Sequence, residues 1–274
     1  MQLVRTVADL RHALKNQHNI TLVPTMGNLH DGYLSLVRIA RERGGLVVAS
    51  VFVNRLQFAP HEDFETYPRT LERDCALLFA SGCDVVFAPC EREMYAQPQG
   101  YTVQPPQRLA GILEGQVRLG FFTGVCTVVL KLFNLVEPHA AVFGKKDYQQ
   151  LRVIENLVRQ LSLPIEILGV DTVRDSNGLA LSSRNGYLSD LRRVDAAYLY
   201  AVLIATAAAI KSGRNDWRTI EREASDALRA RGWQPDYLAI RNQVDLQEPI
   251  RGDRLVILAA AKLGGTRLID NLEL

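Results

Sequence analysis

His30 stands at a position suited to binding phosphate. It lies in residues 24–32, between an apolar run at residues 20–23, typical of a buried strand, and helical periodicity at residues 30–43. A helix N-terminus offers unpaired N–H groups and a partial positive charge, and both suit phosphate. His30 could add a hydrogen-bond donor there. The spacing of Gly27 and Gly32 matches neither common nucleotide-binding fingerprint, so the segment taken alone is typical of any strand-to-helix turn.

Other polar side chains follow predicted strands at the point where each strand ends. Thr25 follows the first strand, Asn54 and Gln57 follow the apolar run at 46–53, and Lys146 and Asp147 follow the run at 140–143. Ligands of parallel sheets bind at the carboxyl ends of the strands, so these residues are candidates for one site. Without further support, the glutamines could equally be surface amides and Lys146 a solvated lysine at the start of a helix.

The elements that must position these residues alternate between strand and helix. Proline lacks an N–H group for a strand ladder, so Pro24 is expected to end the first strand. Strands that alternate with helices favour an α/β fold with a Rossmann-like parallel sheet covered on both faces. The predicted strands are 20–23, 46–53, 84–87, 140–143 and 165–170, and the predicted helices are 7–17, 30–43, 70–81, 125–136 and 148–161.

The pattern changes after about residue 172. Two helices at 189–212 and 217–231 are followed by strand-like segments at 236–241, 254–261 and 266–272. This order predicts a smaller α+β C-terminal domain. We therefore expect a nucleotide- and acid-binding domain at residues 1–172 and a lid domain at 173–274, with the active site between them.

Composition excludes several classes of protein. Of the 274 residues, 47% are hydrophobic and 23% charged, and the net charge of +2 gives no sign of a nucleic-acid or membrane surface. The longest apolar run, residues 198–210, is too short for a bilayer span, and the N-terminal residues do not resemble a signal peptide. The four cysteines contain no C-x-x-C pair, so we expect reduced thiols, no metal site and a cytoplasmic location.

Several of these segments resemble one known family. They are 24–32 (Pro-Thr-Met-Gly-Asn-Leu-His-Asp-Gly), 52–54 (Phe-Val-Asn), 57–58 (Gln-Phe), 67–70 (Tyr-Pro-Arg-Thr), 143–144 (Phe-Gly), 146–150 (Lys-Asp-Tyr-Gln-Gln), 178–185 (Gly-Leu-Ala-Leu-Ser-Ser-Arg-Asn) and 267–271 (Arg-Leu-Ile-Asp-Asn). In this order they resemble the pantothenate synthetases (pantoate–β-alanine ligases), which belong to the HIGH-motif nucleotidyltransferases. The resemblance implies ATP and Mg²⁺ as cofactors, a pantoyl-adenylate intermediate, small-molecule acid and amine substrates, and a homodimer.

The resemblance also implies roles for individual residues. His30, Lys146 and Arg184 match catalytic positions, with His30 and Lys146 on the phosphates and the Ser-Ser-Arg loop clamping the triphosphate. The implied substrate-binding residues are Met26, Tyr33, Phe52, Asn54, Gln57, Arg118, Phe121 and Gln150. The implied ATP-binding residues are Pro24, Thr25, Met26, Gly27, His30, Gly144, Lys146, Asp147, Val173, Leu181, Ser182, Ser183 and Arg184.

The chain departs from the family pattern at several motif positions. Tyr33 stands for a second histidine, Arg55 for a proline, Leu119 for a proline, Phe121 for a histidine and Lys145 for a glutamate. Three interpretations follow. The chain is a working pantothenate synthetase, a paralogue that activates a different acid or joins a different amine, or a weakly active or non-catalytic binding relative. The retained glutamines, Lys146 and the Ser-Ser-Arg loop favour a catalyst, and the first interpretation is preferred.

Overall fold

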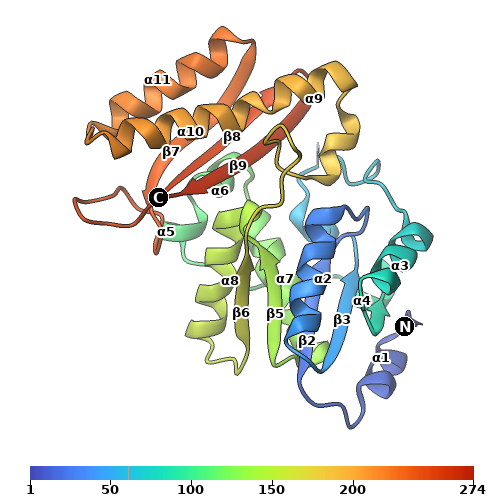
Figure 1. The fold of residues 1–274 in the computed structure, drawn as a ribbon. Coiled ribbons are helices and arrows are strands. Elements are labelled where there is room, and N and C mark those ends of the chain that lie inside the picture. The colour runs from blue at the N-terminus through green and yellow to red at the C-terminus, as the bar shows by residue number, and fades with distance from the viewer. Residues whose placement is uncertain (61) are drawn as a thin grey trace. The chain divides into compact units, whose positions relative to one another are not determined.

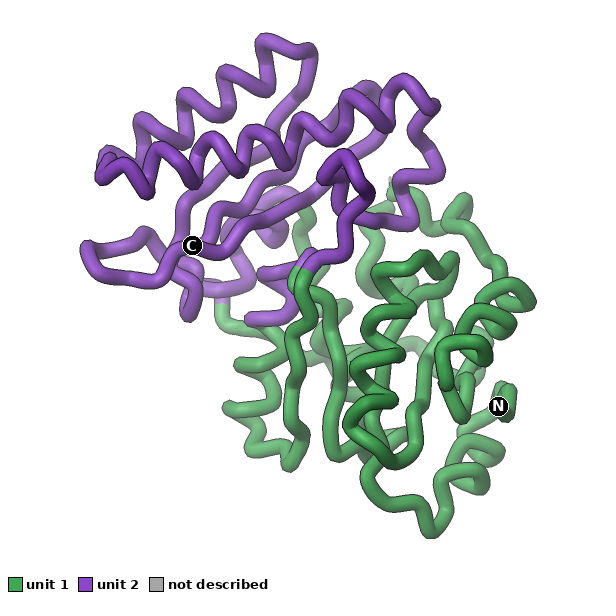
Figure 2. The backbone as a smooth tube through the Cα atoms, in the orientation of Figure 1, with its two compact units in different colours: residues 1–106, 118–145, 153–171 green, residues 107–117, 146–152, 172–274 purple. Residues whose placement is uncertain are grey.

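The computed structural model describes residues 1–60 and 62–274. The chain forms two compact units, shown in different colours in Figure 2. Unit 1 contains residues 1–106, 118–145 and 153–171, and unit 2 contains residues 107–117, 146–152 and 172–274. That residues 1–172 bind the nucleotide and the acid and that residues 173–274 act as a lid stays a prediction.

Unit 1 is built on a six-stranded sheet in which neighbouring strands are parallel, which confirms the predicted α/β fold (Figure 1). The spatial order is β1-β4-β3-β2-β5-β6. The central strands are predominantly apolar because both faces of a parallel sheet are buried, although Thr21 and Ser50 are buried in them as well. The strands are β1 (Gln2–Val4), β2 (Ile20–Thr25), β3 (Leu46–Val51), β4 (Val85–Phe87), β5 (Ala140–Gly144) and β6 (Glu166–Val170).

The strand order reverses next to β2. The chain passes from β2 to β3 and β4 on one side, then returns to place β5 on the other side of β2. The carboxyl ends of β2, β3 and β5, at Thr25, Val51 and Gly144, therefore belong to adjacent strands. Such a reversal is where ligands bind in open α/β sheets.

Helix α2 (Asp31–Glu42) covers β2, β3 and β5 with its apolar stripe. Leu34, Val37 and Ala40 pack in one core cluster with Val23 and Ala49 of the sheet. The glycines that follow the helix, at 44 and 45, have φ of +73° and +82°, a conformation that ends helices readily. The helices outside unit 2 are α1 (Val7–Leu14), α2 (Asp31–Glu42), α3 (Leu71–Ala80), α4 (Glu91–Met94) and α7 (Phe121–Val136), while α8 (Tyr148–Gln160) is divided between the two units.

The expectation that Pro24 ends the first strand is wrong. β2 runs to Thr25 and pairs with β3 along its whole length, Pro24 lying opposite Ser50. Pairing with β5, in contrast, stops at Leu22. The Thr25 carbonyl accepts a hydrogen bond from the Phe52 N–H, so the backbone polar groups of Thr25 point toward β3. Those of the preceding residue, Pro24, point to the opposite side, toward β5. Its missing N–H therefore removes no ladder bond.

Other boundaries also differ from the predictions. Helix α7 begins at Phe121 rather than residue 125, directly after Gly120, whose φ is +81°. The helix predicted at 189–212 is two helices that meet at Ala197. Short elements escaped prediction because a few residues carry no measurable periodicity. They are β1, α4, α5 (Gln107–Ala110), α6 (Glu114–Val117) and the 3₁₀ turns η1 (Arg55–Gln57), η2 (Lys145–Asp147) and η3 (Ser183–Tyr187).

Unit 2 contains a three-stranded antiparallel sheet in the order β7-β8-β9, which confirms the predicted α+β C-terminal part. Its strands are β7 (Trp233–Asn242), β8 (Leu255–Leu263) and β9 (Thr266–Glu273), and its longer helices are α9 (Asp190–Ala196), α10 (Tyr198–Lys211) and α11 (Trp217–Ala230). Figure 1 shows α10 and α11 alongside this sheet. Leu203 and Leu228 from these helices share a core cluster with Ile240 and Ile257 from the strands.

One helical stretch in unit 2 is long and apolar enough to cross a membrane. Residues Asp190–Lys211 span 22 residues and pass a test of length and composition. The core helix of a soluble protein passes the same test, and Leu199, Val202 and Leu203 of this stretch lie in the core of unit 2. The finding is therefore weak support for a membrane span, and the predicted absence of one stays a prediction.

The four cysteines should differ sharply in reactivity. All are free thiols, with Cys90 exposed and Cys83 and Cys126 buried. Burial raises the pKa of Cys83 to about 11 and that of Cys126 to about 12, so neither forms the nucleophilic thiolate near neutral pH. We expect iodoacetamide at pH 7.5 to label Cys90 first in the native protein and to leave Cys83 and Cys126 unlabelled, as mapped by peptide mass spectrometry. Labelling of Cys126 at the rate of Cys90 would contradict this burial.

Candidate active site

The turn between β2 and α2 is fixed by the residue that ends the strand. Thr25 is buried, and its Oγ1 donates to the Ser50 carbonyl at 2.7 Å and accepts from the Gly27 N–H at 3.2 Å. Gly27 and Asn28 both have positive φ, +84° and +52°. Consecutive residues of this kind reverse the chain tightly, and glycine and asparagine tolerate the conformation best. Pro24 and Met26, the other predicted ligand contacts here, are half-buried.

A buried carboxylate from α3 holds this turn from behind. Asp74 is 0% exposed and accepts from the N–H groups of Asn28 and Leu29, each at 2.9 Å, and from Thr70 Oγ1 at 3.0 Å. Asp74 is not among the residues predicted from the sequence. A signal was present, because Asp74 lies on the same helical face as Leu71 and Leu78, where a polar residue is out of pattern. Its hydrogen bonds explain the exception.

His30 is the N-cap of α2. Its Nδ1 accepts from the Gly32 N–H at 3.1 Å, so the neutral imidazole carries its proton on Nε2. The ring lies 4.7 Å from the ring of Tyr33, centroid to centroid. The structure therefore places His30 at the N-terminus of a 12-residue helix with a donor on Nε2, as a phosphate contact requires.

The second polar group of unit 1 is formed by η1 and its N-cap, Asn54, shortly after the end of β3. Asn54 is 1% exposed and donates from Nδ2 to Gln57 Oε1 at 3.1 Å and to the Gly124 carbonyl at 3.2 Å. Its Oδ1 accepts from Tyr95 Oη at 2.7 Å. Phe52 is buried before it, with its ring edge-on to the Tyr95 ring. Gln57, a predicted substrate-binding residue, is thus held by its neighbour.

Gly124 allows η1 to approach α7. A Cβ at this position would lie 2.1 Å from the Leu56 carbonyl oxygen and 2.7 Å from the Gln57 nitrogen. We expect Gly124→Ala to push η1 away and to weaken binding of the acid that the resemblance assigns to Gln57 at least tenfold, measured as the KM for that acid. Gly120→Ala is not a matched control, because the positive φ of Gly120 would strain any other residue there. Thr123→Ala is used instead, since Thr123 directly precedes Gly124 and is half-buried. Equal KM values for Gly124→Ala and wild type would contradict this packing.

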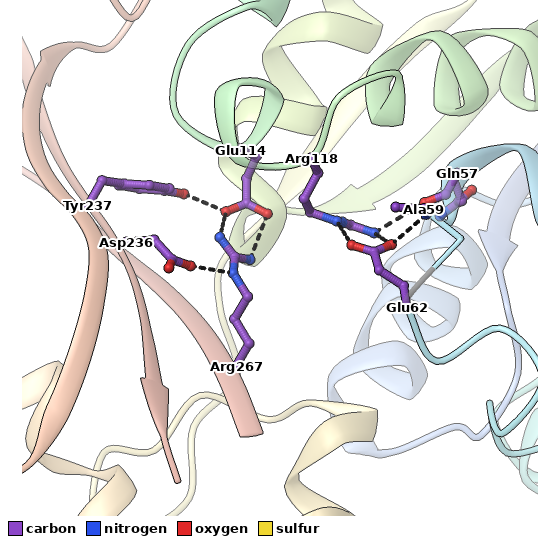
Figure 3. Close-up of polar contacts among 8 residues, drawn as sticks. All are labelled: Gln57, Ala59, Glu62, Glu114, Arg118, Asp236, Tyr237 and Arg267. Atoms are coloured by element: carbon purple, nitrogen blue, oxygen red, sulfur yellow. Dashed lines mark hydrogen bonds and ion pairs between the residues drawn. The ribbon is translucent and has the colours of Figure 1, made fainter. Parts of the chain in front are cut away.

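Arg118, another predicted substrate contact, is engaged by the protein. Its guanidinium donates to Glu62 from Nε at 2.6 Å and from Nη2 at 2.8 Å, and Nη2 also donates to the Gln57 carbonyl at 3.1 Å (Figure 3). The same guanidinium lies 3.8 Å from the centroid of the Phe121 ring. Phe121 is 9% exposed and packs on Phe122. Arg118 therefore supports η1 from the side of α7.

The two extra cations at motif positions are neutralised within unit 1. Arg55 forms ion pairs with Glu65 and Glu91, each at 3.2 Å, and its side chain is 54% exposed. Lys145 forms an ion pair with Asp171 at 2.8 Å. Neither residue therefore adds an uncompensated positive charge to unit 1.

The other candidate residues begin where β5 ends. A Cβ built on Gly144 would meet no atom within 4 Å, so the backbone there is open. Lys146 and Asp147 follow in η2, and Asp147 is exposed. Within residues 1–60 and 62–274, no ion pair uses the Lys146 ammonium. The Lys146 carbonyl accepts from Asn271 Nδ2 at 2.9 Å, which ties this residue to β9.

The paired glutamines of α8 have different roles. Gln149 is 2% exposed, accepts from the Glu114 N–H at 3.0 Å and donates to the carbonyls of Leu109 and Ile112 at 2.8 Å each. It therefore anchors the segment 107–117. Gln150, the predicted substrate contact, is half-buried, and among the described residues no hydrogen bond uses its amide.

Segment 107–117 is also held by a cluster of charges in unit 2 (Figure 3). Glu114 pairs with Arg267 through contacts of 2.6 and 2.9 Å and accepts from Tyr237 Oη at 2.9 Å. Arg267 also pairs with Asp236 at 2.7 Å. Burial and the Glu114 carboxylate raise the pKa of the Tyr237 phenol well above its usual value, so the hydroxyl stays a donor. Glu114 is not among the residues predicted from the sequence.

The Ser-Ser-Arg loop follows a short hairpin braced by β9. Arg174 forms a bridge with Ala180 and pairs with Asp270 through contacts of 2.6 and 2.8 Å. The Leu181 N–H donates to the Val173 carbonyl at 3.0 Å, which closes the hairpin. Ser182 then caps η3 by accepting from the Arg184 N–H at 3.2 Å. Ser183 and Arg184 are half-buried in that turn.

The structure thus gathers the predicted residues into two local groups. In unit 1, residues 24–33 and 52–57 follow adjacent strands of the sheet, with Arg118 and Phe121 against the second group. In unit 2, Lys146 and the hairpin before Ser182 are both tied to β9.

The comparisons decide which family this arrangement represents. A family model described as pantoate-beta-alanine ligase matches residues 2–273. The chain belongs to the pantoate–β-alanine ligase family. It is 58% identical to a pantothenate synthetase of Leptothrix cholodnii, over 100% of both sequences.

Two solved members of the family share the fold over nearly their whole length. The pantothenate synthetase of Thermus thermophilus superposes with a TM-score of 0.94 at 47% identity, covering 100% of this chain and 99% of that one. The pantoate-beta-alanine ligase of Francisella tularensis, complexed with beta-gamma ATP and beta-alanine, has a TM-score of 0.84 at 32% identity, covering 100% and 97%. The family match runs through Tyr33, Arg55, Phe121 and Lys145, so the comparisons do not bear out the interpretation of these residues as altered motif positions.

Proposed function

We propose that this chain is an ATP-dependent ligase that condenses pantoate with β-alanine to give pantothenate, AMP and pyrophosphate. The observation that carries the proposal is the family match over residues 2–273. The first step joins a carboxylate oxygen of pantoate to the α-phosphorus of ATP, and the bond to the β-phosphate breaks. In the second step the amine nitrogen of β-alanine attacks the acyl carbon and loses a proton while AMP leaves.

In unit 1, we assign His30 and the α2 N-terminus to the phosphates, where negative charge must be stabilised by fixed donors. The backbone from Pro24 to Gly27 lines the nucleotide. Gln57 binds the acid through its amide, and Asn54 and Arg118 hold the 3₁₀ turn that carries it. Met26, Tyr33, Phe52 and Phe121 border these groups. This assignment rests on the adjacent strand ends described above.

In unit 2, we assign Lys146 to a phosphate and Asp147 to the ribose, with Gly144 leaving the strand end open. The Gln150 amide, which no hydrogen bond among the described residues uses, is assigned to the acid. Val173, Leu181 and the loop Ser182, Ser183 and Arg184 complete the nucleotide contacts. The proposal includes residues 1–172 as the nucleotide- and acid-binding part and residues 173–274 as a lid, because an acyl adenylate must be kept from water.

Mg²⁺ is the counter-ion proposed for the ATP phosphates. The described residues form no cluster of three histidine, cysteine, aspartate or glutamate side chains. Mg²⁺ commonly keeps several waters and binds through substrate phosphates with few protein ligands, so the donor set is compatible with an ion that arrives on ATP. A homodimer, a cytoplasmic location and the absence of nucleic-acid or membrane partners are proposed from the family resemblance and composition.

Pyrophosphate release tests this function. Purified protein with ATP, Mg²⁺ and pantoate should release pyrophosphate, while other small hydroxy acids should give much less. Addition of β-alanine should then yield AMP and pantothenate in equal amounts. Release with another acid but not with pantoate would replace the proposal with the paralogue interpretation.

A further inference from the structure

Tyr95 lies outside every segment to which the sequence assigned a role, yet its hydroxyl contacts the acid-binding group. It follows α4, and its Oη donates to Asn54 Oδ1 at 2.7 Å. The ring packs edge-on to Phe52, and the Lys131 ammonium lies 4.9 Å from its centroid. Burial and the Glu91 carboxylate raise the pKa of the Tyr95 phenol well above its usual value, so the hydroxyl keeps its proton at neutral pH.

The partners of Asn54 leave only one orientation for its amide. The Leu56 N–H can only donate, and it lies 3.4 Å from Oδ1. The Gly124 carbonyl can only accept, and it lies 3.2 Å from Nδ2. With Tyr95 on Oδ1 and Gln57 on Nδ2, the two donors and both acceptor positions of the amide are used. Asn54 therefore has no group left for a ligand, and it acts on Gln57.

The orientation of the Asn54 amide fixes that of the Gln57 amide. Asn54 Nδ2 donates to Gln57 Oε1 at 3.1 Å, which makes the oxygen the inner end of the amide and Nε2 the outer end. Among residues 1–60 and 62–274, no hydrogen bond uses Gln57 Nε2. Two N–H donors are thus presented to a ligand, and they select an acceptor such as a carboxylate or hydroxyl oxygen.

We propose that Tyr95 is a positioning residue for the acid substrate, acting through Asn54 to hold the Gln57 amide with its donor end toward the ligand. This inference rests on the proposed function of Gln57. Without the hydroxyl, Asn54 Oδ1 loses its short hydrogen bond, and Asn54 and Gln57 can rotate together to other amide orientations. The acid should then bind less tightly, while the nucleotide contacts of the His30 turn should be unaffected.

The test compares Tyr95→Phe with Tyr101→Phe, the same change at a side chain that is 93% exposed. We expect Tyr95→Phe to raise the KM for pantoate about three- to tenfold, the loss of one neutral hydrogen bond. The KM for ATP should match wild type, and the thermal unfolding midpoint should fall only by the few degrees that one lost hydrogen bond costs. Tyr101→Phe should change none of these values. An unchanged pantoate KM in Tyr95→Phe overturns the proposal.

A second measurement follows Gln57 directly. Its side-chain NH₂ signals in a ¹⁵N–¹H spectrum are assigned by their loss in Gln57→Ala. They should move in Tyr95→Phe and stay in place in Tyr101→Phe, and unmoved signals in Tyr95→Phe overturn the proposal. If wild type releases no pyrophosphate with pantoate, the proposed function falls, while these signals still decide whether Tyr95 positions Gln57.

Discussion

Asp74→Ala is expected to lower the free energy of unfolding by at least about 1–3 kcal/mol, because the buried N–H of Leu29 loses its acceptor. The half-buried N–H of Asn28 loses the same carboxylate and adds to this cost. Both N–H groups lie 2.9 Å from the carboxylate. The turn they form carries His30 at the start of α2. The KM for ATP should therefore rise in the same variant, beyond any effect of stability.

Glu72→Ala is the matched control, because Glu72 is exposed on the same helix and the substitution removes the same charge. Urea unfolding followed by far-UV circular dichroism measures stability, since both tryptophans, Trp217 and Trp233, lie in unit 2 and do not report on unit 1. A stability of Asp74→Ala equal to that of Glu72→Ala would remove Asp74 from its place behind the turn.

Asp270→Ala is expected to cost about 3–5 kcal/mol, the usual effect of leaving one member of a buried ion pair without its partner. The side chains of Asp270 and Arg174 are 3% and 17% exposed, and two contacts of 2.6 and 2.8 Å join them. Arg174 also donates to the Gly178 carbonyl at 3.1 Å and lies 3.7 Å from the centroid of the Tyr200 ring. The variant should loosen the hairpin that leads to Ser182, so ATP binding should weaken as well.

Glu248→Ala breaks the Arg218–Glu248 ion pair, whose side chains are 86% and 73% exposed, and should cost less than about 1 kcal/mol. Tryptophan fluorescence during urea unfolding compares the two variants, because both tryptophans report on unit 2. If the midpoint of Asp270→Ala moves no further than that of Glu248→Ala, the pair does not brace the hairpin.

The fold was predictable because its signals are local. The run at Leu46–Val51 is apolar except for Ser50, as expected of a strand buried on both faces, and helix α2 shows its apolar stripe in the sequence. The end of β2 was wrongly predicted at Pro24, because a missing N–H costs a ladder hydrogen bond only where the neighbouring strand on that side pairs with the residue. That neighbour, β5, lies more than a hundred residues away along the chain.

The site was predictable only for residues that belong to recognisable motifs. Tyr95 and Gly124 act on Asn54 from 41 and 70 residues away, and no local pattern indicates such contacts. The sequence also could not say whether Arg55 and Lys145 face a ligand. Arg55 and Lys145 instead form ion pairs with carboxylates such as Glu91 and Asp171, and no sequence pattern indicates that these residues would be their partners.

The most direct measurement of the central claim is the fate of carboxylate oxygen. Pantoate labelled with ¹⁸O in its carboxylate is incubated with ATP, Mg²⁺ and β-alanine, and the phosphorus-containing products are analysed by mass spectrometry. Activation as pantoyl adenylate predicts that one ¹⁸O atom appears in AMP, because the acyl oxygen leaves with the α-phosphate. Label in inorganic phosphate together with ADP would show an acyl-phosphate route, and unlabelled AMP would show that ATP is cleaved without activating the acid; either result would contradict the account.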